Sequence, residues 1–313
     1  MPDFKVAAGR SNPKLAERVA DNLGIRLSEV TVRNFSDGEI WVKYEENVRG
    51  VDLFIIQSTF ASADNLMELL MLIDAGKRAS AKRVTAVIPY YGYARQDRKD
   101  QPRVSITAKL VANLLSRAGA DRIITIDLHS AQIQGYFDIP LDHLYASPVL
   151  IRALKKLNVE DPVFASPDVG GIKTARSYAK RLGEGDLILV DKRRPKHNVA
   201  EIMHVVGEVE GKNIVIVDDM IDTGSTFVQC AEVLKEKGAN DITGICVHPV
   251  LSGQAVEKIE NADSIDRLLV TDTIPLKKDI EKVEVVSVSD LLGEAIIRTH
   301  DSRSISSLFE IER

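Results

Sequence analysis

The chain has 313 residues, 44% of them hydrophobic, and is long enough to bury a large core and to form two domains. Its 41 basic and 46 acidic residues are interspersed and leave a net charge of −5, which argues against an extended nucleic-acid-binding surface. No stretch approaches the roughly 18 apolar residues of a membrane helix, and the first residues lack the pattern of a secretory signal. The two cysteines, Cys230 and Cys246, lack metal-ligand spacing and are expected in the core. We therefore expect a cytoplasmic protein that binds neither nucleic acid nor membranes.

Strand-like segments with a turn between them occupy the beginning of the chain. The sequence predicts strands over residues 4–8, 30–33, 40–44 and 53–57. The segment 34–39, NFSDGE, contains Asp-Gly, which is a strong turn signal. It is interpreted either as a simple turn or as a site where an exposed Phe35, beside two acidic residues, stacks on a purine ring.

A helix and a cationic loop follow. Apolar residues at helical spacing predict a helix over 64–80, whose basic end suits the helix dipole. After a strand at 84–88, the segment 89–99 (PYYGYARQDRK) combines tyrosines with cations in a chain that has only 5% aromatic residues. The alternative is a solvated loop with scattered cations. We interpret it as a loop that handles a charged planar ligand, with Arg95 and Gln96 beside the tyrosines.

Two predicted strand ends carry candidate metal ligands. A helix over 104–118 leads to a strand at 123–126, after which come Asp127 and His129. Asp168 likewise follows a strand at 163–166. A lone histidine is usually structural, but ligands of open α/β sheets bind at the carboxyl ends of strands. Both positions are therefore candidates for contact with metal or phosphate.

A charged run, DKRRPKH at 191–197, follows a predicted strand at 187–190. The default for such a run is a solvated loop. Between two strands of a phosphate-binding sheet, it is also suited to close over reacting phosphates.

The stretch 214–226, IVIVDDMIDTGST, carries the clearest chemical pattern. Four apolar residues predict a buried parallel strand over 214–217, and the acidic residues follow where that strand should end. A polar loop with Gly224 then opens a helix that stops at Gly238. Exposed amides at such a helix start bind phosphate, while the carboxylates suit sugar hydroxyls or Mg²⁺ through water. The alternative is an ordinary capped helix start with solvated aspartates.

Alternating strands and helices continue to the end of the chain, with a strand at 283–288 and a helix at 291–298. This repeat predicts an α/β protein with two doubly wound domains and parallel sheets. We expect an N-terminal domain over 1–147, a C-terminal domain over 148–298, and a tail over 299–313 that packs on the first domain.

Several segments together resemble the ribose-phosphate pyrophosphokinases of the phosphate-activated class, which have phosphoribosyltransferase-like domains. The segments are NFSDGE at 34–39, YARQDRK at 93–99, DLHSAQIQGYFDIP at 127–140, SPDVGG at 166–171, KRRP at 192–195, NVAEIM at 198–203 and VDDMIDTGST at 217–226. The resemblance covers nearly the whole chain. One departure is Ser225, where the family usually has glycine.

The resemblance implies that sugar O1 of ribose 5-phosphate attacks the β-phosphorus of Mg-ATP, which gives phosphoribosyl diphosphate and AMP. Mg²⁺ is the implied cofactor, with His129 and Asp168 as the metal-associated positions. The implied catalytic residues are Lys192 and Arg194. The implied ATP-binding residues are Phe35, Asp37, Gly38, Glu39, Arg95 and Gln96. The implied ribose-5-phosphate-binding residues are Arg194, Asp218, Asp219, Asp222, Thr223, Gly224, Ser225 and Thr226.

The resemblance also implies a homohexamer, in which the turn at 34–39 completes the ATP site of a neighbouring subunit. Inorganic phosphate and ADP are the implied effectors. The residues implied to bind them are Arg49, Arg78, Ser80, Ser304 and Ser306. Two alternatives remain: a phosphoribosyltransferase that uses the same 218–226 loop, and a catalytically silent regulatory subunit with the same fold.

Overall fold

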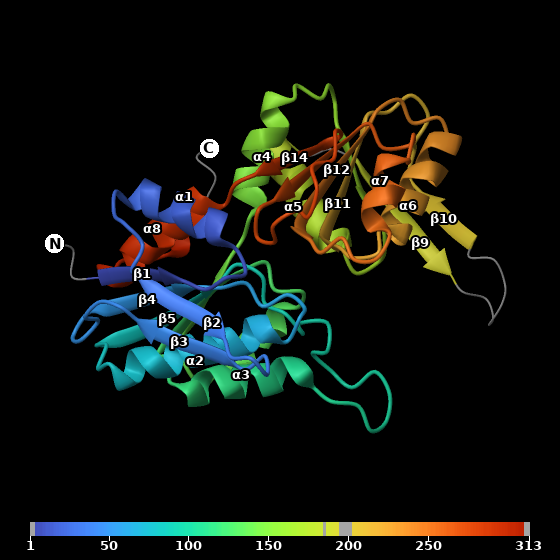
Figure 1. The fold of residues 1–313 in the computed structure, drawn as a ribbon. Coiled ribbons are helices and arrows are strands. Elements are labelled where there is room, and N and C mark those ends of the chain that lie inside the picture. Colours follow the sequence, from blue (N-terminus) through green and yellow to red (C-terminus); the bar gives the residue numbers. More distant parts are fainter. Residues whose placement is uncertain (1–3, 184–185, 194–201, 310–313) are drawn as a thin grey trace. The chain divides into compact units, whose positions relative to one another are not determined.

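A computed structural model of the chain describes residues 4–183, 186–193 and 202–309 and divides into two compact units (Figure 1). Of the described residues, unit 1 holds 4–145, 273–275 and 287–309, and unit 2 holds the rest. Within this described part, no helix is long and apolar enough to cross a membrane.

Unit 1 is built on a five-stranded parallel sheet in the order β1-β4-β5-β6-β7. Its strands are β1 (Phe4–Ala8), β4 (Asp52–Ile56), β5 (Arg83–Ile88), β6 (Arg122–Ile126) and β7 (Leu141–Leu144). Every residue of β4 is buried, as expected for a parallel strand covered on both faces. Because the strands are parallel, the segments that follow β5 and β6 begin at the same edge of the sheet.

Helices cover both faces of this sheet (Figure 1). The helices α1 (Pro13–Leu23) and α8 (Ser289–His300) pack together on one face, and α2 (Asp64–Arg78) and α3 (Thr107–Ala118) share the other. The sequence predicts a C-terminal domain that extends to residue 298. In the structure, however, α8 groups with unit 1 because it packs on α1.

A two-stranded antiparallel ribbon, β2 (Val30–Asn34) and β3 (Ile40–Tyr44), completes unit 1 with two short 3-10 helices, η1 (Ala131–Tyr136) and η2 (Ser306–Phe309). The ribbon contacts α2 through β3, and the guanidinium of Arg33 lies 4.3 Å from the ring centre of Trp41. The turn between the two strands is the predicted segment 34–39.

Unit 2 is built on a seven-stranded sheet in the order β10-β9-β8-β11-β12-β13-β14. Its strands are β8 (Val163–Ser166), β9 (Leu187–Arg193), β10 (Ile202–Val206), β11 (Ile214–Ile221), β12 (Ile242–Pro249), β13 (Arg267–Thr271) and β14 (Val283–Val286). The described strands pair in parallel, except for the antiparallel pair β10 and β9. The direction of winding reverses between β8 and β11. Such a reversal is where open α/β sheets bind their ligands.

The helices of unit 2 are α4 (Ser147–Lys156), α5 (Ile172–Leu182), α6 (Ser225–Glu236) and α7 (Ala255–Glu260). On α6, Phe227, Cys230 and Leu234 are buried in one core with Ile216 and Cys246 of the sheet. Both cysteines are therefore core residues. The predicted α/β class with two parallel sheets is confirmed.

Three predicted boundaries are wrong by three or four residues, and others differ by one or two. β11 does not end at 217 but continues to Ile221, because β12 is long enough to pair with Met220 and Ile221. β9 continues through the first part of the charged run to Arg193, because β10 pairs with it as far as Ile202. α3 begins at Thr107 rather than at 104. Charged side chains favour solvent and so suggested loops in the sequence. Their backbone can nevertheless join a strand when a partner strand supplies the hydrogen bonds.

Candidate active site

Three carboxylates lie at the point where the sheet of unit 2 reverses. Asp168 follows β8, while Asp218 and Asp219 lie on the neighbouring strand β11. Burial raises the pKa of Asp218 well above its usual value, and the charges of Asp219 and Asp168 raise that pKa further. The site therefore concentrates negative charge, and its electrostatics favour a bound cation or donor hydroxyls.

Asp168 has a structural role beside any functional one. Its Oδ1 accepts a hydrogen bond from the amide of Gly171 at 2.8 Å, and its carbonyl oxygen accepts one from Ser166 Oγ at 2.7 Å. The carboxylate thus holds the loop that leads into α5. Within the described residues, no group of three or more histidine, cysteine or acidic side chains is arranged to hold a metal. Mg²⁺ requires no such group, since one or two carboxylates together with substrate phosphates commonly hold it.

The loop 222–226 joins β11 to α6 as a strand-loop-helix unit. Gly224 has φ of 75° and precedes the helix, which begins at Ser225. Among the described residues no side chain caps this helix start. The ordinary capped start was the alternative interpretation, and it predicts a Ser, Thr or Asp cap that the structure lacks. The amides of the first turn are therefore oriented to bind an anion.

Two side chains from the segment 252–258 contact this loop. Ser252 Oγ donates a hydrogen bond to Asp222 Oδ1. Lys258 Nζ lies 2.7 Å from Ser225 Oγ and 3.4 Å from the carbonyl oxygen of Thr223. Sequence reasoning missed Lys258, because α7 is short and nothing local connects it with a loop far away in the chain. Lys258 places its ammonium group beside the start of α6.

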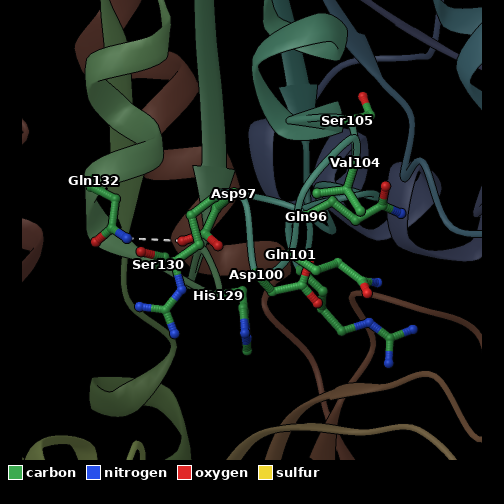
Figure 2. A pocket seen from close by; sticks show the side chains of 11 residues that line it. Gln96, Asp97, Asp100, Gln101, Val104, Ser105, His129, Ser130 and Gln132 are labelled. Atoms are coloured by element: carbon green, nitrogen blue, oxygen red, sulfur yellow. Dashed lines mark hydrogen bonds between the residues drawn. The ribbon is translucent and has the colours of Figure 1, made fainter.

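A second polar site lies in unit 1, where the segments after β5 and β6 form a pocket of about 520 Å³. Its lining residues run from Arg95 to Gln132 and bring Arg95, Gln96 and His129 together. Figure 2 shows His129 between Ser130 on one side and Gln101 on the other. Two arginines, Arg95 and Arg98, supply positive charge to this pocket.

Hydrogen bonds hold the walls of this pocket. Asp97 is buried and accepts a hydrogen bond from Gln132 Nε2 at 2.8 Å (Figure 2). The amide of Leu128, which directly precedes His129, donates to His143 Nε2 at 2.9 Å. His143 must therefore present an unprotonated Nε2 to this amide. The pocket thus combines hydrogen-bond donors and two arginines with the carboxylates of Asp97 and Asp100, a polar lining suited to a charged ligand.

The turn at 34–39 projects the predicted adenine-binding residues outward. Phe35 is 49% exposed. The Asp37 side chain accepts a hydrogen bond from the amide of Glu39 at 3.0 Å, and the Phe35 amide donates to the carbonyl oxygen of Glu39 at 2.8 Å. The turn is therefore closed by its own hydrogen bonds and exposes an aromatic ring and two carboxylates to solvent.

The predicted effector residues form two groups in unit 1. The amide of Gly50, next to Arg49, donates to the carbonyl oxygen of Ser80 at 2.8 Å, so these segments are neighbours. Arg78 is exposed and pairs with Asp74 at 2.7 Å. Ser304 Oγ accepts a hydrogen bond from the amide of Ser306 at 3.2 Å in the C-terminal tail.

The two predicted catalytic cations belong to the charged run. The backbone of Lys192 lies in β9 opposite Met203 of β10. Arg194 lies outside the described residues.

The fold and the loop 222–226 together define a doubly wound α/β protein with an uncapped helix start at the switch point of its second sheet. Comparison with known proteins identifies its family. The N-terminal domain of ribose phosphate pyrophosphokinase matches residues 4–119, and the phosphoribosyl synthetase-associated domain matches residues 186–310. The chain belongs to the ribose-phosphate pyrophosphokinase family.

Individual relatives match nearly the whole chain. The ribose-phosphate pyrophosphokinase of Chlorobaculum tepidum is 58% identical over 309 residues, which cover 98% of this chain and 95% of that protein. That of Vibrio cholerae is 54% identical over 314 residues, covering 99% and 100%. The crystal structure of phosphoribosylpyrophosphate synthetase from Mycobacterium smegmatis matches with a TM-score of 0.90 at 40% identity, covering 96% of this chain and 99% of that one.

Proposed function

We propose that this chain transfers the diphosphate group of Mg-ATP to O1 of ribose 5-phosphate and releases AMP and phosphoribosyl diphosphate, for nucleotide biosynthesis. The observation that carries the proposal is the 58% identity, over 98% of the chain, with a protein named ribose-phosphate pyrophosphokinase. The uncapped start of α6 beside three carboxylates supports it, because a sugar phosphate needs both an anion site and acceptors for its hydroxyls.

The residues of unit 2 are proposed to hold the sugar. The amides of the first turn of α6, with Thr223 and Thr226, bind the 5-phosphate, while Asp218 and Asp219 accept hydrogen bonds from ribose hydroxyls. Holding the sugar in this way directs O1 toward the nucleotide and makes the attack effectively intramolecular. Lys192 and Arg194 contribute positive charge to the phosphate oxygens on which negative charge develops.

The residues of unit 1 are proposed to hold ATP. Arg95 and Gln96 bind the phosphates, and the turn that carries Phe35, Asp37 and Glu39 binds adenine, in a neighbouring subunit of a homohexamer. An exposed aromatic ring beside carboxylates suits a purine with an amino group.

His129 and Asp168 are the positions proposed to associate with Mg²⁺. The donor set fits this ion, because burial and, after it, the charges of Asp219 and Asp168 raise the pKa of Asp218, and a divalent cation offsets that concentration of negative charge. When bound, Mg²⁺ neutralises charge on the transferring oxygens.

Phosphorus NMR tests the proposed reaction directly. The purified protein is mixed with Mg-ATP, ribose 5-phosphate and inorganic phosphate, and the released nucleotide is identified. AMP should appear in equal amount with a sugar diphosphate. Release of ADP would identify an ordinary sugar kinase instead, and no turnover would favour the silent regulatory subunit.

Replacement of Lys258 by methionine should raise the KM for ribose 5-phosphate about fivefold to twentyfold and leave the KM for ATP unchanged. The reason is that a charge-assisted contact to phosphate is worth about 1 to 2 kcal/mol in a half-buried site. Steady-state kinetics with each substrate varied in turn measures the split. Lys278→Met, on an exposed lysine of the same unit that pairs with Glu260, is the matched control. An unchanged KM for ribose 5-phosphate would remove Lys258 from the site.

The proposed activation by inorganic phosphate predicts the behaviour of an Arg49→Ala, Arg78→Ala double variant. Both arginines are exposed and lie near Ser80, so their guanidinium groups are accessible to an anion at a subunit surface. The variant should lose most of its phosphate activation and its inhibition by ADP, while basal turnover persists. Rates measured over a phosphate titration test this. Activation equal to that of the native protein would contradict the assignment.

A further inference from the structure

A buried carboxylate in unit 1 connects the core with the turn at 34–39. Glu68 lies on α2 and its side chain is 2% exposed. It accepts hydrogen bonds from the backbone amide of Arg10 and from Arg10 Nε, the latter at 2.7 Å. Gln57 Nε2, also buried, lies 3.2 Å from the same carboxylate. The charge of Glu68 is therefore paired and hydrogen-bonded, as a buried carboxylate requires.

The backbone before Arg10 fits closely against this carboxylate. A Cβ atom placed on Gly9 would lie 2.7 Å from Glu68 Oε1 and 2.4 Å from Gln57 Oε1. The segment after β1 is thus held against α2 from both its backbone and its side chain. Arg10 consequently has a fixed base, although its side chain is 45% exposed.

Arg10 extends from this base to the end of β2. Its Nη1 donates a hydrogen bond to Asn34 Oδ1 at 2.7 Å, and Asn34 Nδ2 in turn donates to the carbonyl oxygen of Gly38 at 2.7 Å. Asn34 and Gly38 flank Phe35 and Asp37. The hydrogen-bonded series therefore runs from Glu68 in the core, through Arg10 and Asn34, to the far side of the turn.

We infer that Arg10, anchored by Glu68, is a positioning residue that acts through Asn34 to hold the 34–39 turn in its nucleotide-binding conformation. The inference rests on the proposed function, in which this turn binds adenine. A two-residue link to a buried charge restricts the turn before the nucleotide arrives, so less conformational entropy is lost on binding. Arg10 itself need not contact the nucleotide.

The test compares Arg10→Ala, Asn34→Ala and the double variant with the native protein. Each single substitution should raise the KM for ATP about fivefold to tenfold, the effect of losing one charge-assisted hydrogen bond. The KM for ribose 5-phosphate should stay unchanged in each variant. The melting temperature should stay unchanged in Asn34→Ala, whereas Arg10→Ala also removes the partner of the buried Glu68 carboxylate and should melt lower. The double variant should show the same KM for ATP as the single variants, because the two residues act in series. Arg117→Ala, on an exposed arginine in the last turn of α3, is the matched control.

Hydrogen-deuterium exchange supplies a readout that does not depend on turnover. The amides of residues 35–39 should exchange faster in both single variants and at the native rate in Arg117→Ala. Unchanged exchange, additive effects in the double variant, or an equal rise of both KM values would overturn the inference. Failure of the native protein to form AMP would instead overturn the proposed function, and the exchange experiment would still decide whether Arg10 holds the turn.

Discussion

Replacement of Lys192 by alanine should lower kcat by about 10³-fold or more, the scale seen when a cation that stabilises a transferring phosphoryl group is removed. Diphosphate transfer offers the protein little covalent chemistry, so catalysis depends on positioning and on charge that balances the developing negative oxygens. The backbone of Lys192 lies in β9, where it pairs with Met203 of the antiparallel strand β10. AMP formation at saturating substrates measures kcat.

The matched control for this prediction is Lys180→Ala, which removes an exposed lysine in the last turn of α5 in the same unit. This variant should turn over at the native rate. Lys192→Arg keeps the charge and should recover part of the activity, although a guanidinium is larger and planar. A kcat near the native value in Lys192→Ala would rule out this lysine as the catalytic cation.

Local pattern was sufficient to predict the fold class and the positions where chemistry was expected. A run such as IVIV at 214–217 is apolar on both faces, which is typical of a strand buried between two layers of helices. Carboxylates directly after such a run fall at the ligand-binding edge of the sheet without any knowledge of its partners. The structure accordingly brings Asp168 near Asp218 and Asp219, and it places Arg95 and His129 in one pocket.

The features that the local sequence pattern failed to predict depend on contacts between residues far apart in the chain. Lys258 reaches Ser225 from a different helix, and Glu68 reaches Arg10 from α2, so neither contact has a periodic trace in the sequence. The extension of β9 into the charged run likewise depends on the partner strand β10. The departure at Ser225 gains a physical meaning only in this context, because its hydroxyl contacts the ammonium group of Lys258.

Replacement of Asp218 by asparagine should make the ligand-free protein more stable while it lowers kcat/KM for ribose 5-phosphate about 10²-fold. Burial and the charges of Asp219 and Asp168 raise the pKa of Asp218 well above its usual value of 3.8. The folded state therefore binds a proton more tightly than the unfolded state. The contribution of Asp218 to the free energy of unfolding is fully present below pH 3.8. It is lost as the pH rises through the raised pKa of this carboxyl group. At neutral pH the ionised carboxylate destabilises the fold, and asparagine removes that charge.

The melting temperature of Asp218→Asn should exceed that of the native protein by about 2 to 4 °C at neutral pH without metal, the shift expected for about 1 kcal/mol. The difference should shrink as the pH falls toward 4, where the native carboxyl group also becomes neutral. Added Mg²⁺ should stabilise the native protein more than the variant, because the ion binds where the carboxylates repel one another. Asp263→Asn, on an exposed aspartate of the same unit, is the matched control and should show none of these changes. A variant that melts lower than the native protein at neutral pH would contradict this prediction. It would show that the Asp218 carboxylate stabilises the ligand-free fold.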